Sequence, residues 1–179
     1  HLPDVIKFGA TSLPAGGVGV AVQNISHSTI YFGRVTHHET GVLFTDFGGG
    51  VAYNTVHMPW VDLCKISIKI APDVATAGWV NQNTFIAGGI TQSPNTFGGS
   101  ATRRTGWRHL VLDGGAGNSV HANTFVGCSF EGDISEYAIE FHNAADNVFV
   151  GNTRFEQGTA GAPCTVSTTF NVFTTAAPL

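Results

Sequence analysis

A five-residue pattern returns along this chain at a fixed interval. Residues 123–127 read Asn-Thr-Phe-Val-Gly, residues 147–151 read Asn-Val-Phe-Val-Gly, and residues 171–173 begin the pattern again, so both intervals are 24 residues. The same pattern stands 40 residues upstream, at 83–87. A repeat of this length is typical of solenoids, in which each repeat buries its apolar face against the next one.

The residues between these motifs indicate short strands. The pair Phe-Glu follows two of the motifs, at 130–131 and 155–156, and the apolar run 137–141 has a counterpart one repeat earlier at 109–113. Gly, Asn and Asp separate the runs, and no long segment has the 3.6-residue period of an amphipathic helix. Each repeat therefore reads as several short strands joined by turns. Weaker echoes of the motif stand at 53–56 and 22–25, where Asn54 and Asn24 take the place of the repeated Asn.

If each repeat makes one coil, equivalent strands pair in parallel at roughly 4.8 Å and equivalent side chains lie above one another. This arrangement predicts an internal stack of Phe85, Phe125, Phe149 and Phe173. It also predicts a ladder of amides at a turn, formed by Asn83, Asn123, Asn147 and Asn171. Asn suits that turn because its amide both donates and accepts, and because it tolerates a left-handed backbone. Gly127 and Gly151 mark the next bend.

The fold class predicted from the repeat is all-β, a single-stranded parallel β-helix of about six or seven coils. The rival fold is an antiparallel sandwich, which needs hairpin turns at intervals of about 8–12 residues. Such signals are few here, and residues 113–115 are the best of them. We expect one domain over 1–179, with terminal segments 1–16 and 174–179 and an inserted loop at 91–108 that lengthens one repeat.

Composition excludes several classes of protein. With 42% hydrophobic and 11% charged residues the chain does not match a disordered coil. A net charge of −4 with eight Lys and Arg argues against a nucleic-acid partner. No run approaches the roughly 18 apolar residues of a membrane span, so no membrane insertion is expected. The first residue is His1 in place of Met, which leads us to expect a processed or excised chain.

No cofactor or metal is expected. The cysteines at 64, 128 and 164 lie far apart and form no CxxC, so we interpret them as buried thiols of a strand protein. The run His37-His38-Glu39 lacks the HExxH spacing and is interpreted as a surface loop before a strand.

Several segments resemble the pectate-lyase-like β-helix domains of bacteriophage tailspikes and tail appendages. They are residues 78–89, the motifs 123–125 and 147–149, and the Phe-Glu pairs 130–131 and 155–156, within a resemblance that extends from about residue 17 to residue 173. The resemblance implies a right-handed coil, assembly as a parallel homotrimer, and binding and cleavage of a bacterial cell-surface polysaccharide. It implies a place on the virion tail, and the greater length of the family's long-coiled members implies that this chain is a fragment or a short member.

Acidic residues gather after the motifs and suggest catalysis. A glycosidase needs two carboxylates about 5 Å apart for retention or about 6.5–9.5 Å apart for inversion, and one coil step is close to 5 Å. Glu131 and Glu156 stand one coil apart after equivalent Phe residues, and Asp133 and Glu136 lie in a nearby loop, so these four are the catalytic candidates. The alternative is structural, with the Glu of each Phe-Glu pair capping a turn or pairing with Arg154.

The inserted loop carries the candidates for glycan binding, which are Arg103, Arg104, Trp107, Arg108 and His109. Guanidinium groups match the carboxylates or sulfates of acidic sugars, and an indole offers a flat face for a sugar ring. A lyase would need a base such as His109 or Tyr137 beside an arginine. The alternatives are a solvated loop or an intersubunit contact with the acidic residues.

One further group stands after Asn54, where His57, Trp60 and Asp62 come together as a candidate lining for a groove.

Three functions stay open from the sequence. The first is a tailspike-like domain that binds and cleaves a bacterial surface polysaccharide. The second is a non-catalytic tail adhesin or structural module. The third is a secreted polysaccharide lyase or glycoside hydrolase that works as a monomer. The low charge and the exposed strand edges at the coil ends give the first two a physical reason to form a homotrimer.

Overall fold

The computed structural model describes residues 5–6, 16–46, 48–58, 60–73, 78–91, 105–117, 119–131, 136–151, 154–155, 164–166 and 172–175. For 5–6, 154–155, 164–166 and 172–175 it describes the backbone. The described residues form strands, with one short 3-10 helix, η3 (Gly115–Gly117). The protein is therefore all-β.

The strands belong to four sheets, which we number I to IV in the order in which the chain passes through them. Sheet I contains β2 (Val18–Gln23), β5 (Thr40–Thr45), β9 (Ile66–Ile70), β13 (Arg108–Asp113), β17 (Tyr137–His142) and β21 (Cys164–Val166). Sheet II contains β6 (Gly50–Ala52), β10 (Trp79–Asn81), β14 (Val120–His121) and β18 (Ala144–Ala145). Sheet III contains β3 (Thr29–Tyr31), β7 (Thr55–His57), β11 (Thr84–Ile86), β15 (Thr124–Val126), β19 (Val148–Gly151) and β22 (Val172–Thr175). Sheet IV contains β1 (Val5–Ile6), β4 (Val35–Thr36), β8 (Val61–Asp62), β12 (Gly89–Thr91), β16 (Ser129–Glu131) and β20 (Arg154–Phe155).

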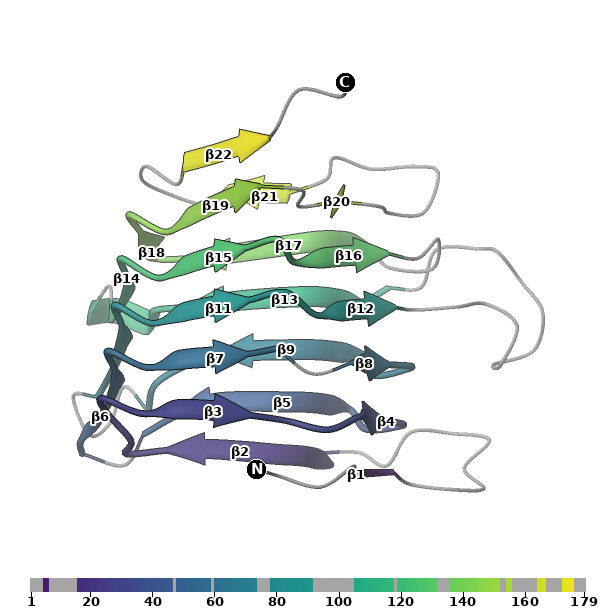
Figure 1. Ribbon diagram of the computed structural model, residues 1–179, viewed down its shortest axis with the longest axis horizontal. Helices are drawn as coiled ribbons and strands as arrows, with labels where there is room; N and C mark the ends of the chain where they lie inside the picture. The colour runs from purple at the N-terminus through teal and green to yellow at the C-terminus, as the bar shows by residue number, and fades with distance from the viewer. Residues whose placement is uncertain are drawn as a thin grey trace.

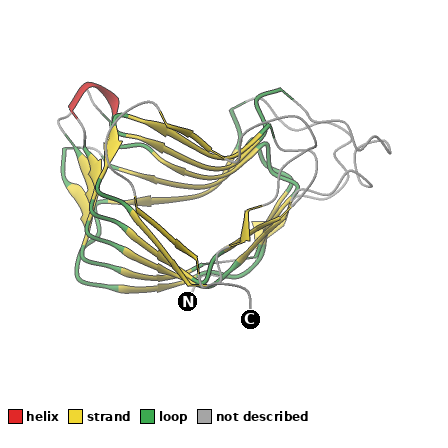
Figure 2. Ribbon diagram, turned by 90° about the horizontal axis from the view of Figure 1, so that it is seen from above, coloured by secondary structure: helices red, strands yellow, loops and turns green. Residues whose placement is uncertain are grey.

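From β5 to β20 the chain passes through sheets I, II, III and IV in turn and then returns to sheet I. Each strand pairs in parallel with the strand that occupies the same sheet one turn later, as in β11 with β15 and β15 with β19. The turns of chain lie one above another in Figure 1, and Figure 2 shows the sheets as walls around an interior. The side chains of the hydrophobic core fill this interior. The molecule is a solenoid-like protein with parallel strands, consistent with a parallel β-helix, and the antiparallel sandwich is excluded.

The predicted phenylalanine stack lies inside the solenoid. The rings of Phe85 and Phe125 are parallel within 9° with centroids 4.7 Å apart, and those of Phe125 and Phe149 are parallel within 6° at 4.6 Å. Phe44 meets Phe85 edge to face. The backbone register places Phe173 opposite Phe149, and its side chain is outside the described residues. The 24-residue interval therefore identified residues that stack in the core.

The predicted asparagine ladder is also present at the turn between sheets II and III. Asn83 Nδ2 donates to Asn123 Oδ1 at 3.1 Å, and Asn123 Nδ2 donates to Asn147 Oδ1 at 3.1 Å. Asn54 continues the ladder toward the N-terminal end, because its Nδ2 donates to Asn83 Oδ1 at 2.9 Å. Asn171 lies outside the described residues. The ladder bonds each turn of chain to the next in a place that water does not reach, because all four described amides are buried.

Two details of the ladder prediction were wrong. The left-handed residue is the one before each Asn, with φ of 58° at Tyr53 and 54° at Gln82, because each Asn itself must turn inward to bond its neighbours. The residue that faces Asn54 in the preceding turn is Ser28, whose backbone N–H donates to Asn54 Oδ1 at 3.0 Å, and Asn24 is not the equivalent residue.

Other features of the repeat were predicted correctly. Residues 109–113 belong to the strand that pairs with 137–141, with Leu110 opposite Ile139. Gly127 and Gly151 both have positive φ, of 62° and 83°, which L-residues with a side chain adopt at a cost. The predicted insertion at 91–108 stays a prediction, because residues 92–104 lie outside the described residues; β12 ends at Thr91 and β13 begins at Arg108.

Two of the three cysteines are described, and both are buried free thiols as predicted. Burial raises the pKa of Cys64 and that of Cys128 to about 12. The side chain of Cys164 lies outside the described residues. Among the residues that the structure describes, no helix has the length and apolar character needed to cross a membrane.

Candidate functional site

The outer face of sheet IV carries the most exposed tryptophan of the described residues. Val61, Ile90 and Phe130 occupy equivalent positions in its strands, and all three are fully buried in the core. Because side chains alternate along a strand, the residues on either side of them point outward. We call this outer surface the sheet IV face, and its described members are Arg34, Trp60, Asp62, Gly89, Thr91, Ser129 and Glu131.

Trp60 lies against the backbone of the next turn of chain. Its side chain is 52% exposed, although its ring covers Gly89, the first residue of β12. A Cβ added to Gly89 would lie 2.5 Å from Trp60 Cζ3, so the ring occupies the space that a side chain at 89 would need. One face of the indole therefore rests on the strand, and the ring presents apolar surface to solvent.

Polar groups stand beside the indole in a fixed arrangement. Asp62 Oδ2 accepts a hydrogen bond from Arg34 Nη2 at 3.0 Å, and Asp62 Oδ1 accepts one from Thr91 Oγ1 at 3.0 Å. Further along the same face, Glu131 Oε1 accepts a hydrogen bond from Ser129 Oγ. The register places Asp62, Thr91 and Glu131 in one row along the solenoid axis, with Thr91 between the two carboxylates. An exposed aromatic face beside oriented hydroxyl and carboxylate groups is suited to a polyhydroxylated ligand.

In the part of the chain that the structure describes, the four predicted catalytic acids do not come together in one place. Glu131 belongs to the sheet IV face, whereas Asp133 and Glu156 lie outside the described residues. Glu136 precedes β17 and belongs to a cluster on sheet I. The Glu131–Glu156 pair therefore stays a prediction, and the described register ends with Phe130 opposite Phe155.

Glu136 and Arg108 form the centre of the sheet I cluster. Arg108 Nη1 donates to Glu136 Oε2 at 2.8 Å, and Arg108 Nε donates to Glu140. The guanidinium carbon also lies 4.6 Å from the centre of the Tyr137 ring. Glu136 accepts a second bond from the backbone N–H of Gly106 at 2.8 Å and so ties the chain entering β13 to the next turn. The cluster joins the last part of the insertion to the solenoid, and the exposure of the Arg108 side chain is only 12%.

The remaining predicted glycan-binding residues divide into two groups. Trp107 is 7% exposed and His109 is 0% exposed, with the His109 ring 6.4 Å from the core residue Phe130. Both therefore lie in the interior and not on a surface that a polymer could reach. Arg103 and Arg104 lie outside the described residues.

Sequence reasoning named Trp60 and Asp62 as a possible groove lining but did not connect them to Glu131, and it missed Arg34, Gly89 and Thr91. The signal that could have identified these residues is the register between strands of successive turns. Once Asn54 and Asn83 are aligned as equivalent residues, Trp60 falls opposite Gly89 and Asp62 falls opposite Thr91. His57, the third member of that group, is on sheet III, where it stacks on Tyr31 with ring centroids 4.3 Å apart.

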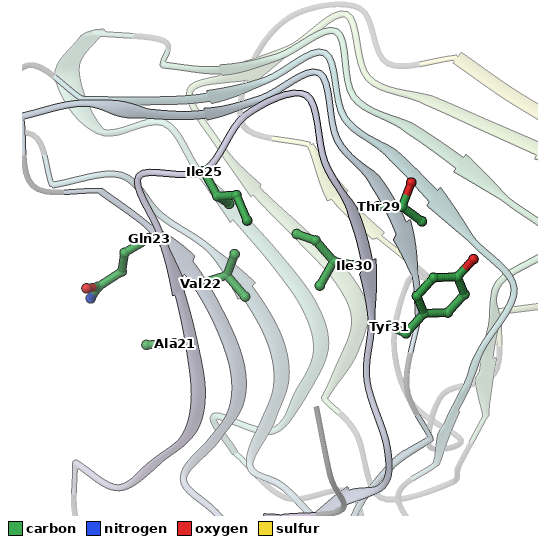
Figure 3. Close-up of a pocket in the computed structure, with 7 residues that line it drawn as sticks. All are labelled: Ala21, Val22, Gln23, Ile25, Thr29, Ile30 and Tyr31. Atoms are coloured by element: carbon green, nitrogen blue, oxygen red, sulfur yellow. The ribbon is translucent and has the colours of Figure 1, made fainter. Parts of the chain in front are cut away.

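A second surface feature is a hollow at the N-terminal end of the solenoid, between β2 and β3. It has a volume of about 340 Å³ and is lined by Ala21, Val22, Gln23, Ile25, Thr29, Ile30 and Tyr31. Figure 3 shows Val22, Ile25 and Ile30 pointing toward one another within it. These residues continue the apolar core to its end, and the lining includes no charged side chain with which to orient a ligand.

Comparisons with protein-family models, with curated proteins and with solved structures find no match for this chain.

Proposed function

We propose that this protein binds a bacterial cell-surface polysaccharide on the sheet IV face, in the manner of a phage tailspike receptor-binding domain. The observation that carries the proposal is the Trp60 indole, half-exposed and resting on Gly89 beside the hydrogen-bonded Asp62. A single exposed aromatic residue is ordinary, and the support here is that the indole is held against the strand beside hydrogen-bonded polar groups.

The chemistry of the face fits a sugar polymer. The outward face of the indole packs against the C–H groups of a sugar ring, and the carboxylates of Asp62 and Glu131 accept hydrogen bonds from hydroxyl groups. Outward side chains recur at each turn, at the strand spacing of roughly 4.8 Å, so a polymer lying along the axis meets a new set at each turn. The binding face is assembled from residues of several turns and needs no deep pocket.

The proposal also covers the handedness of the solenoid and its number of coils. We expect a right-handed coil, because parallel crossover connections are right-handed in about 98% of cases, and six or seven coils along the whole chain. The support is the recurrence of the four sheets in one order and the uninterrupted parallel pairing in each. A pectate-lyase-like solenoid with these properties is the expected scaffold.

A second candidate function is depolymerisation of the bound polysaccharide. Asp62 and Glu131 stand two strand steps apart in one row, which corresponds to about 9–10 Å at the usual strand spacing. That separation is near the upper limit of about 9.5 Å for two carboxylates that hydrolyse a glycosidic bond with inversion. One carboxyl would protonate the leaving oxygen while the other activated a water molecule on the opposite side of the sugar. A non-catalytic adhesin keeps the same face without this reaction.

Assembly as a homotrimer on a virion tail, or secretion, completes the proposal. Sheet III offers a surface for association, because Tyr31 and Val150 are exposed in one outward row that also contains His57, Ile86 and Val126. Burying such a row against neighbouring copies would remove apolar surface from water. Sedimentation of a trimer at micromolar concentration supports this part, and a monomer at all concentrations contradicts it.

The experiment is a binding screen against purified capsular and O-antigen polysaccharides, followed by a reducing-sugar assay on each one bound. Saturable binding to at least one polysaccharide supports the proposed function, and failure to bind any member of a broad panel contradicts it. Product formation that disappears in Glu131→Gln and in Asp62→Asn supports depolymerisation. Binding without products favours the adhesin, and an unchanged rate in both variants excludes this carboxylate pair.

A further inference from the structure

A second tryptophan repeats the arrangement of Trp60 on a different sheet. Trp79, the first residue of β10, is 43% exposed and lies opposite Gly50 of β6. A Cβ added to Gly50 would lie 2.3 Å from Trp79 Nε1 and 2.3 Å from Cε2. The indole therefore rests on the backbone of the preceding turn, held on one side and open to solvent on the other.

The groups around Trp79 are amides and an imidazole. Asn81 is the next outward residue on the same strand, since Val80 between them is fully buried, and Asn81 Nδ2 lies 3.1 Å from His121 Nε2. Asn24 Oδ1 lies 3.0 Å from the Cβ position of Gly49, directly before Gly50. An amide and an imidazole thus stand on the same face as the indole, and a second amide, that of Asn24, lies beside the turn that the ring covers. All three side chains can both donate and accept hydrogen bonds.

The outer face of sheet II differs from the sheet IV face in its charge. Its described outward positions are Gly50, Ala52, Trp79, Asn81, Ser119, His121, Asn143 and Ala145. None of these side chains is a carboxylate, an ammonium or a guanidinium, whereas the sheet IV face has Arg34, Asp62 and Glu131. Figure 1 shows strands of sheets II and IV at opposite sides of the solenoid, so one sugar unit cannot contact both indoles.

We infer that the outer face of sheet II is a second carbohydrate-binding site, selective for an uncharged sugar unit, with Trp79 as its platform. The indole packs on the apolar side of the sugar ring, and Asn81, His121 and Asn24 exchange hydrogen bonds with hydroxyl or acetamido groups. An anionic sugar finds no lysine or arginine among the described outward residues of this face to compensate for the desolvation of its charge. The inference rests on the proposed function in so far as both faces bind sugars.

A second site has a functional consequence. Two faces on opposite sides of one molecule can hold two segments of a long chain or two neighbouring chains at once. The second contact is then made at a high effective concentration, and the overall affinity for a polymer exceeds that for a short oligosaccharide. A protein with both faces would therefore retain a dense polysaccharide layer better than it binds a free hexasaccharide.

The test uses the three tryptophans as separate reporters. Protein labelled with ¹⁵N at the indole nitrogens is titrated with chitohexaose and with maltohexaose, and the three indole N–H signals are assigned from Trp60→Ala and Trp79→Ala. We expect a saturable shift of the Trp79 signal in the wild type and in Trp60→Ala. The buried Trp107 signal serves as the internal control for an intact fold and should stay in place.

Each outcome separates this inference from the proposed function. A Trp79 shift that Gly50→Val or Asn81→Ala abolishes, with the Trp107 signal unchanged, supports the second site. A shift of the Trp60 signal alone supports the sheet IV face and overturns the second site. A shift of the Trp79 signal alone supports the second site and leaves the sheet IV face to the polysaccharide screen. If neither hexasaccharide moves the Trp79 signal, the inference fails, whatever the polysaccharide screen gives. An equal shift with oligogalacturonate would overturn the selectivity for uncharged sugars.

Discussion

The ring of Trp60 occupies the place where a side chain at position 89 would begin, with Cζ3 2.5 Å from the Cβ position of Gly89. This relationship joins two turns of the solenoid and determines the orientation of the indole. It also separates the function of the face from the stability of the fold, because the indole is at the surface and is free to move away without opening the core.

Gly89→Val should therefore reduce polysaccharide binding while leaving the fold intact. The new side chain would displace the indole from the strand, and valine is well suited to a strand position. We expect a loss of affinity of about tenfold, or roughly 1.4 kcal/mol, with a change in the free energy of unfolding within about 0.5–1 kcal/mol. Isothermal titration and urea unfolding of the same samples check both parts. Unaltered affinity in a folded variant would show that the platform is not used.

Asn123→Ala should destabilise the solenoid more than most single substitutions. Asn123 Nδ2 donates to Asn147 Oδ1 and to the Val80 carbonyl, both at 3.1 Å, and its Oδ1 accepts from the backbone N–H and the Nδ2 of Asn83. Removing the amide leaves buried polar groups without partners, at about 1–3 kcal/mol for each unsatisfied group. We expect a loss of about 2–4 kcal/mol in denaturant unfolding. Asn81→Ala, which removes a half-buried amide, is the control and should cost under about 1 kcal/mol; similar values for the two would argue against the ladder as a stabilising element.

Gly78→Ala should be destabilising because of a steric clash. A Cβ at 78 would lie 1.7 Å from both carboxylate oxygens of Asp46, a fully buried residue whose Oδ1 accepts a hydrogen bond from the backbone N–H of Asp73 at 3.1 Å. The carboxylate must leave its place, and overpacking of this kind costs about 1–3 kcal/mol or more. Gly127→Ala is the matched control, because its Cβ would meet nothing within 4 Å and only its φ of +62° opposes the change. If thermal unfolding ranks Gly127→Ala as the more damaging, backbone strain and not space dominates.

The buried thiols should make the free energy of unfolding depend on pH. Burial raises the pKa of Cys64 and of Cys128 from 9.0 to about 12. Thiols ionise more readily in the unfolded chain, so the stability that they contribute is complete below pH 9.0 and is lost as the pH rises toward about 12. In a Cys164→Ser background, iodoacetamide at pH 8.5 should modify neither thiol until denaturant unfolds the protein. Rapid alkylation of the native protein would contradict the burial of these side chains.

The sequence was most informative where identical residues recur at equal intervals. The stack of Phe85, Phe125 and Phe149 and the amide ladder could be predicted because a parallel solenoid places equivalent positions above one another. The position of Ser28 was not predicted, because this turn has Ser in place of the ladder Asn and so has no repeated residue by which to align it.

The candidate site was harder to predict because its members are not equivalent residues of a repeat. Trp60 faces a glycine, and Asp62 faces a threonine, so the face appears only when the register between unlike residues is known. Trp107 and His109 were expected at the surface because they follow a long insertion. In the structure the chain has already entered the solenoid at these positions, and both side chains are buried.

The affinity of Trp60→Ala for a polysaccharide that the wild type binds tests the central claim most directly. The appropriate comparison is Tyr53→Ala, which removes another exposed aromatic residue, 53% exposed, that lies on neither the sheet IV face nor the proposed association surface. We predict a loss of about tenfold or more for Trp60→Ala, equivalent to roughly 1.4 kcal/mol, and an affinity within about twofold of the wild type for Tyr53→Ala. Wild-type affinity in a folded Trp60→Ala variant, or an equal loss in both variants, would contradict polysaccharide binding on the sheet IV face.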